Sequence, residues 1–182
     1  MAVIFIDLEA SSLAVWSHPI EISWIGESGQ GESHLIRPEP DWMDWSGASE
    51  TVHGISREEI QRDGTSAAIV AGRALQALGN PADTVVSDAP AFDQAWLDTL
   101  LRAGGHDRRI AVRDVTDIYV DACRPMVEWM ATDEAARAVT QLVEAAKQAE
   151  MARARRRHRA LEDATGLWWT WRWIVRHVAD VG

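Results

Sequence analysis

The feature that most constrains the fold is the stretch from Val3 to Ser12, VIFIDLEASS, near the start of the chain. Val3 to Ile6 is an apolar run of β-branched and aromatic residues without a turn residue, which is typical of a buried central strand rather than a short helix. Asp7 and Glu9 follow directly. Because residues i and i+2 of a strand project from the same face, both carboxylates are expected to leave the end of this strand together.

Two carboxylates held so close repel each other unless a cation lies between them. Carboxylate oxygens are the ligands that Mg²⁺ and Mn²⁺ prefer. The alternative is that Asp7 caps a turn and that Glu9 faces solvent. An Asp-x-Glu pair alone does not decide between the two, so a metal site would need further ligands elsewhere in the chain.

Composition places the chain among ordinary globular proteins. It has 182 residues, 47% of them hydrophobic and 25% charged, and is large enough to bury a core as one domain. No apolar run reaches transmembrane length, and the N-terminus lacks the basic segment of a signal peptide. Because Cys123 is the single cysteine, an intramolecular disulfide and a cysteine-rich metal site are excluded. We therefore expect a cytoplasmic protein without a membrane segment.

The formal net charge is −10, which argues against a protein that coats long nucleic acid through a broad basic surface. The charge is uneven, however. The segment from Lys147 to Arg176 holds eight basic and three acidic residues, a local balance of +5, so the other residues sum to −15. An acidic body with one basic segment suits a small or localised anionic substrate.

The rest of the chain predicts a mixture of strands and helices. Residues 20–25 alternate between apolar and polar, which indicates a half-buried strand, and a third strand is expected near 33–37. Because short connections join these three strands, we expect an antiparallel meander. The predicted order is βββ-αα-β-α-β-α-α-α, with residues 38–50 as a loop. The later elements are a helix capped by Ser56, helices near 65–79, 88–104, 114–123, 133–157 and 161–178, and strands near 84–86 and 110–112.

Asp93 is the first of two later ligand candidates. It lies in the first turn of an expected helix with an apolar stripe, where Asp88 is the expected N-cap. Acidic residues are common in a first turn because they complement the helix dipole, which is the alternative interpretation of Asp93. Since Asp88 is assigned to the cap, Asp93 is the better ligand candidate.

Asp163 is the second candidate, in the segment HRALED from His158 to Asp163. Its helical spacing from Ala160 and Ala164 predicts a place at the edge of the buried face, where an unpaired carboxylate is costly and a metal would resolve that cost. His158 is five residues earlier and does not share that face. We expect it on the loop entering the helix, within reach of bound water. The alternative is a solvated histidine in a basic run.

Taken together, these motifs resemble the DnaQ-like family of DEDD 3′–5′ exonucleases, in its histidine (DEDDh) subtype. The segments at Ile20–Ile22 and at His53 (HGIS) are also similar to that family. The resemblance implies an α/β fold, a ribonuclease-H-like mixed β-sheet of about five strands flanked by helices. It also implies that His158 is the general base and that two Mg²⁺ or Mn²⁺ ions are held by four carboxylates: Asp7, Glu9, Asp93 and Asp163. Substrate contacts are expected from Ser11, Leu13 and His53.

A basic strip leads into His158. Five arginines lie between Arg153 and Arg159, more than the one or two cations that complement a helix end. We expect Arg155, Arg156 and Arg157 to bind substrate phosphates. The alternative is a solvated basic face.

The chain departs from the family pattern at three places. Ser87-Asp88 stands where members often have His-Asn, with one apparent extra residue before Asp93, and Ser12 stands where a glycine often follows the first motif. Residues 114–157 match nothing in the family, although they are expected to be helical. These departures leave the metal chemistry intact, but they leave the substrate preference open.

The resulting expectation is a single exonuclease domain over residues 1–182. It would be a metal-dependent hydrolase that removes nucleotides from the 3′ end of single-stranded RNA or DNA. Either a standalone enzyme or a polymerase proofreading subunit fits the motifs, and the acidic body favours the former. A homodimer is left open, and no membrane partner is expected. The rival from another class is a non-catalytic nucleic-acid-binding or scaffold protein with the same fold.

Overall fold

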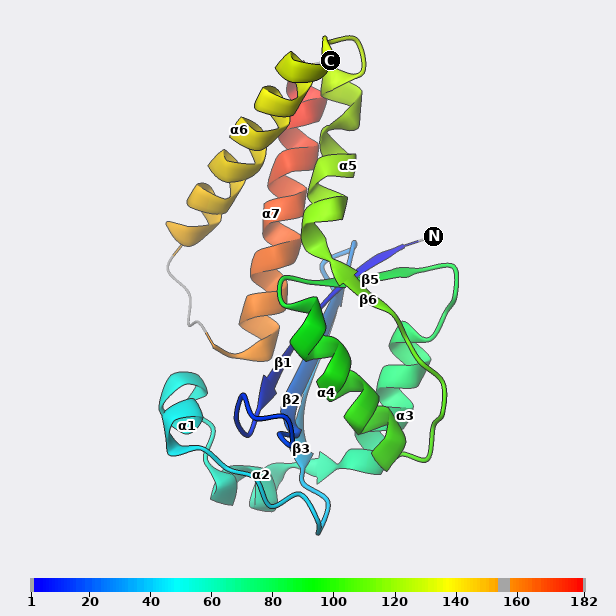
Figure 1. Cartoon of the computed structure of the whole chain (residues 1–182), viewed down its shortest axis with the longest axis vertical. Coiled ribbons are helices and arrows are strands. Elements are labelled where there is room, and N and C mark those ends of the chain that lie inside the picture. Colours follow the sequence, from blue (N-terminus) through cyan, green and yellow to red (C-terminus); the bar gives the residue numbers. More distant parts are fainter. Residues whose placement is uncertain (1, 154–157, 182) are drawn as a thin grey trace.

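The computed structural model describes residues 2–153 and 158–181. Its centre is a sheet with strand order β4-β3-β2-β1-β5-β6 (Figure 1). Antiparallel pairing joins β1 to β2 and β2 to β3, which confirms the predicted meander, whereas β5 runs parallel to both β1 and β6. The strands are β1 (Val3–Ala10), β2 (Pro19–Gly26), β3 (Gly31–Arg37), β4 (Thr65–Ser66), β5 (Thr84–Ser87) and β6 (Val112–Asp114).

The apolar start of β1 is buried on both faces of the sheet. Phe5 and Ile6 are both fully buried and belong to two different hydrophobic clusters, because neighbouring strand residues point to opposite faces. The strand is longer than predicted and continues to Ala10. Asp7 and Glu9 therefore lie within β1 rather than beyond its end, although they still share one face.

Helices cover each face of the sheet. Helices α3 and α4 pack on the face that holds Ile6, whereas α5 and α7 pack on the face that holds Phe5, and α6 packs against α5 and α7. The last three helices lie side by side and extend beyond the sheet as an arm (Figure 1). None of the described helices is long and apolar enough to cross a membrane. The helices are α1 (Gly47–His53), α2 (Arg57–Asp63), α3 (Ala67–Leu78), α4 (Pro90–Ala103), α5 (Val115–Val127), α6 (Thr132–Met151) and α7 (Ala160–Val181).

Several local expectations hold and others fail. Ser56 caps α2 as predicted, because its side chain accepts a hydrogen bond from the Glu59 N–H. Asp88 does not cap α4, whose N-cap is Ala89 without a side-chain bond. The expected loop at 38–50 contains the start of α1, the two-residue strand β4 raises the strand count to six, and α6 ends at Met151 instead of 157.

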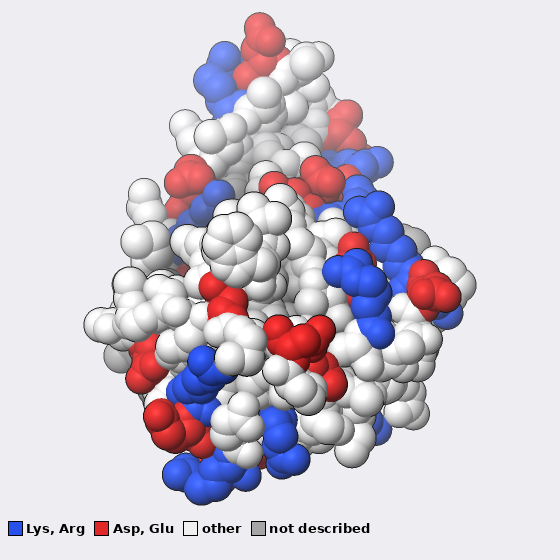
Figure 2. All heavy atoms as spheres, turned by 60° about the horizontal axis from the view of Figure 1, so that its bottom comes forward, with Lys and Arg blue, Asp and Glu red and all other residues white. Residues whose placement is uncertain are grey.

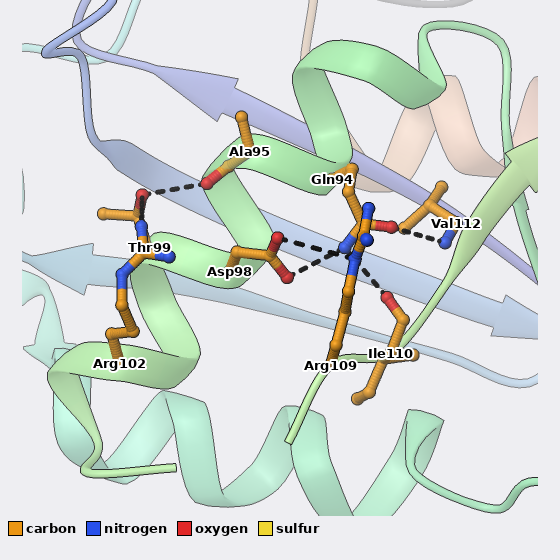
Figure 3. A network of polar contacts seen from close by, with 8 residues as sticks. All are labelled: Gln94, Ala95, Asp98, Thr99, Arg102, Arg109, Ile110 and Val112. Carbon is orange, nitrogen blue, oxygen red and sulfur yellow. Dashed lines mark hydrogen bonds and ion pairs between the residues drawn. The ribbon is translucent and has the colours of Figure 1, made fainter. Parts of the chain in front are cut away.

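A side-chain amide attaches the loop before β6 to α4 (Figure 3). Gln94 Nε2 donates to the Ile110 carbonyl at 2.9 Å, and the Val112 N–H donates to Gln94 Oε1 at 2.9 Å. Asp98 accepts from Gln94 Nε2 at 2.8 Å and lies 3.9 Å from Arg109 Nε. Gln94 thus bonds to this segment as a neighbouring strand would, and it fixes the first turn of α4 against the sheet.

Candidate functional site

Three carboxylates from the two ends of the chain meet at one point. Asp7 and Glu9 come from β1, and Asp163 comes from the first turn of α7. Each offers an oxygen, and these oxygens lie within 4.8 Å of one another, an arrangement that could hold a metal ion. All three residues are partly buried. Hard divalent cations such as Mg²⁺ and Mn²⁺ take this kind of oxygen ligand.

In this acid cluster (Asp7, Glu9 and Asp163), the two carboxylates of β1 are strongly affected by burial and by neighbouring negative charge. Burial, and next the charge of Asp93, raise the pKa of Asp7 well above its ordinary value. Burial, and next the charge of Asp163, raise the pKa of Glu9 to about 8. Proton binding and cation binding relieve the same repulsion, so a divalent ion fits the cluster at neutral pH.

Asp93 lies beside the acid cluster in the first turn of α4 and is 1% exposed. Its Oδ1 accepts a hydrogen bond from the Leu8 N–H at 3.1 Å, and its buried Oδ2 has no hydrogen bond of good geometry, with the Ser87 hydroxyl as the neighbouring polar group. Burial raises the pKa of Asp93 to about 7. An unpartnered carboxylate oxygen in the interior is costly, and a nearby cation or its bound water would satisfy it.

His158 lies on the loop that enters α7, as predicted. Its backbone has φ of 59°, and it is the one non-glycine residue with positive φ in the described part of the chain. Its N–H donates to Asp163 Oδ2 at 2.7 Å. A left-handed backbone at a non-glycine residue persists only where surrounding contacts hold it, and such residues concentrate at functional sites. The side chain is exposed and next to the acid cluster.

Two pockets adjoin the acid cluster, and both are lined by Glu9 and His158. The acidic pocket has a volume of about 550 Å³ and lies between β1, α5, α6 and α7. The apolar pocket has a volume of about 350 Å³ and lies between β1, the loop after it and α1. The charged residues of the acidic pocket, besides His158, are Asp7, Glu9, Asp88, Asp114, Lys147, Glu150 and Asp163, and the apolar pocket is completed by Ala10, Ser12, Leu13, Ala48, Ser49, Val52, His53 and Trp96.

The residues that were expected to contact substrate do not all lie at the same site. Leu13 and His53 both line the apolar pocket. The Ile55 N–H donates to His53 Nδ1 at 3.1 Å, whereas His53 Nε2 is buried without a partner, and burial lowers the pKa of this imidazole. Ser11 is fully buried, and its hydroxyl donates to Asp44 at 2.7 Å, so it anchors the loop after β1 instead of lining a pocket. Arg155, Arg156 and Arg157 lie outside the described residues.

Sequence reasoning missed one wall of the acidic pocket. Asp88 was assigned to a helix cap, but it lines this pocket at the end of β5. Asp88 could have been placed there from the parallel pairing of β5 with β1. This pairing brings the residues that follow β5 close to the carboxylates of β1. Lys147 and Glu150 come from α6, and no spacing in the sequence shows where α6 packs. The region without a family match thus forms a wall of the site.

The surface around this end of the molecule carries mixed charge. On the face shown in Figure 2, lysines and arginines form several separate groups with acidic side chains between them. On this face, the distribution agrees with the net charge of −10.

Comparison with known proteins finds a similar fold in solved structures of exonuclease I. E. coli exonuclease I with zinc ion and single-stranded DNA has a TM-score of 0.66 at 16% identity, over 92% of this chain and 38% of that chain. The same enzyme with a dT13 oligonucleotide has a TM-score of 0.66 at 16% identity, over 92% and 39%. This chain thus spans less than half the length of either. No family model and no curated protein matches it. The chain has the ribonuclease-H-like mixed α/β fold of these exonucleases.

Proposed function

We propose that residues 1–182 form a single exonuclease domain of the DEDDh type that hydrolyses the 3′-terminal phosphodiester bond of single-stranded RNA or DNA. The observation that carries the proposal is the convergence of Asp7, Glu9 and Asp163 within 4.8 Å, with His158 held beside them by its N–H bond to Asp163. Asp7 and Glu9 lie more than a hundred positions from His158 and Asp163 along the chain, and the fold that joins the two pairs is like that of exonuclease I.

Four carboxylates of the chain would hold two Mg²⁺ or Mn²⁺ ions: Asp7, Glu9, Asp93 and Asp163. Such ions supply charge stabilisation for the scissile phosphate and make a bound water more acidic. His158 is exposed at the pocket, so its imidazole would be available to take the proton of an attacking water. The leaving group is the 3′ oxygen of the preceding nucleotide.

The two pockets would bind different parts of the strand. The apolar pocket suits the terminal base, because Leu13, Val52 and Trp96 offer apolar contact and His53 Nε2 is a buried nitrogen that lacks a partner. Lys147 contributes an ammonium group to the acidic pocket. Arg155, Arg156 and Arg157 would add phosphate contacts. Single-stranded DNA is bound in the exonuclease I structures with the same fold, which supports an unpaired strand as the ligand.

A standalone enzyme of the cytoplasm fits the acidic body better than a protein that follows long nucleic acid. A homodimer is the proposed assembly, and light scattering coupled to gel filtration measures it directly. A monomeric mass would contradict that part of the proposal and leave the chemistry untouched.

The polarity and the metal requirement can be tested on labelled strands. A 5′-labelled RNA or DNA strand should shorten one nucleotide at a time in Mg²⁺ or Mn²⁺, whereas a 3′-labelled strand should release labelled mononucleotide at once. EDTA should stop both reactions. Asp7→Asn should remove turnover because a shared ion loses a ligand. Absence of hydrolysis by the wild type under all these conditions, with retained strand binding, would favour a non-catalytic binding protein.

A further inference from the structure

Glu21, on β2, is a buried acid outside the acid cluster, and it is saturated with hydrogen bonds. It is 2% exposed. Arg159 donates to it twice, from Nε at 3.0 Å and from Nη2 at 2.7 Å. The Ala160 N–H donates to it at 3.0 Å, and the Ser33 hydroxyl donates at 3.3 Å. Glu21 is therefore fully used by the chain itself and is not free to bind a metal ion.

The Glu21–Arg159 pair lies between β2 and the start of α7, next to the acid cluster on both sides. In the pairing of β1 with β2, Glu21 is opposite Glu9. Arg159 directly follows His158, and its carbonyl accepts the Asp163 N–H at 3.0 Å. The residues that flank His158 are thus attached to a core strand by one carboxylate.

Three effects stabilise this attachment: the pairing of a buried charge, the two parallel arginine hydrogen bonds and the position of the Glu21 carboxylate at the start of α7. A buried carboxylate is tolerated only when it is paired and hydrogen-bonded, and an arginine that donates two parallel bonds also fixes orientation. Ala160 is the first residue of α7, where backbone N–H groups have no partner within the helix. A carboxylate there is also favoured by the helix dipole. Loss of Arg159 would leave the Glu21 charge buried without its ion pair, whereas the Arg159 side chain is 25% exposed.

The attachment also explains how the backbone of His158 is held. A positive φ at a histidine persists only where the surrounding structure holds it. The Asp163 carboxylate accepts the His158 N–H on one side, and the Glu21–Arg159 pair fixes the following two residues on the other. Without the Glu21–Arg159 contact, the positive φ of His158 would be held on one side only.

We propose that the Glu21–Arg159 pair positions the catalytic loop: it fixes the start of α7 to β2 and so sets the place of His158 and Asp163 relative to Asp7 and Glu9. The inference rests on the proposed function for its catalytic consequence, but not for its structural one. Glu21 and Arg159 touch no reacting atom, so both are positioning residues and not catalytic residues.

Arg159→Lys is the sharpest variant because it keeps the charge and removes the paired geometry. A displacement of about 1 Å at a reacting group costs on the order of 100-fold in rate, so kcat should fall by about 10- to 100-fold with KM nearly unchanged. Glu21→Gln keeps an acceptor for the Ala160 N–H and should give a decrease of the same kind. Arg62→Lys is the matched control, since Arg62 makes the same two bonds to Asp63 in solvent, at 3.0 and 2.7 Å.

Amide hydrogen exchange gives a readout that needs no activity. In Arg159→Lys, the amides of His158 and Ala160 should lose protection, whereas that of Ile174 in the middle of α7 should keep it. Unchanged protection and unchanged kcat would overturn the positioning role. A uniform loss of protection along the chain would also overturn it, in favour of a purely global contribution to stability. If the wild type hydrolyses no strand, the proposed function fails, yet the exchange pattern still tests the attachment.

Discussion

The acidic and apolar pockets share Glu9 and His158 but differ in nearly every property that a ligand would meet. Among the described residues that line the acidic pocket, six are carboxylates and Lys147 is the one lysine or arginine. The apolar pocket is lined by Leu13, Val52 and Trp96 and by the buried imidazole of His53. A nucleotide has the same two parts, an anionic backbone and an aromatic base.

The difference shows which group each side can bind. An apolar wall stabilises a base by contact and excludes water, but it offers a phosphate neither a hydrogen bond nor a positive charge. The carboxylates of the acidic pocket repel a phosphate unless cations stand between them. Metal binding and strand binding should therefore be coupled on the acidic side and independent on the apolar side.

The largest effect is expected where the two pockets meet. His158→Ala should lower kcat by about 10²- to 10⁴-fold, the usual contribution of general-base assistance. Mn²⁺ affinity, measured by calorimetric titration, should stay close to that of the wild type because the carboxylates remain. Activity within a few-fold of the wild type would return His158 to an ordinary solvated histidine.

A smaller effect is expected on the apolar side. Leu13 is 73% exposed and lines the apolar pocket, so a bound base would cover part of its side chain. Leu13→Ser should raise KM by about tenfold, or ~1.4 kcal/mol, with kcat and salt dependence unchanged. Ile69→Ser is the control, since Ile69 on α3 is 61% exposed and lines neither pocket. Equal effects of the two substitutions would remove the apolar pocket from the binding model.

On the acidic side, a substitution should change both the KM and the salt dependence of strand binding. Lys147 pairs with Glu144 at 3.5 Å in an exposed contact that is worth little, so it can turn toward a phosphate at low cost. Lys147→Met should raise KM a few-fold and flatten the log–log salt dependence of strand binding by roughly 0.7. Arg137→Met, at an exposed position of the same helix, should change neither. The triple change of Arg155, Arg156 and Arg157 to Gln should flatten the slope further, and an unchanged slope would leave that strip as solvated surface.

The last effect concerns stability without metal. Burial and neighbouring carboxylates raise the pKa of Glu9 from 4.5 to about 8. Since the unfolded chain releases this proton near pH 4.5 and the folded protein only near pH 8, stability in EDTA should fall as the pH rises through that window. Glu9→Gln should flatten this decline in Tm. An identical pH profile in the two proteins would show that the Glu9 proton is not linked to folding.

Much of this site follows from local patterns. Alternation along β1 places Asp7 and Glu9 on one face, and helical spacing places Asp163 at the edge of a buried face. Both were predicted because neighbours in the sequence decide them. The β-meander follows equally from short connections between alternating segments.

Other parts depend on contacts between distant segments. Nothing near Glu21 indicates that Arg159, 138 residues away, will pair with it. The position of α6 over the acidic pocket depends on its packing against α5 and α7. The prediction that Asp88 caps α4 was wrong. The N-cap of α4 is Ala89, one residue later than the capping pattern predicts, and the side chain of Asp88 lines the acidic pocket instead.

The central claim is that carboxylates from both ends of the chain hold the ions that cleave the strand. Asp163→Asn tests it most directly, because Asp163 is the ligand that α7 brings to β1. The measurement is the rate of shortening of a 5′-labelled strand as Mn²⁺ is increased from an EDTA-treated start. The wild-type rate should rise from zero to a plateau, and the variant should stay more than about 10²-fold lower throughout. Equal plateaus, or a wild-type rate that EDTA does not affect, would contradict the claim.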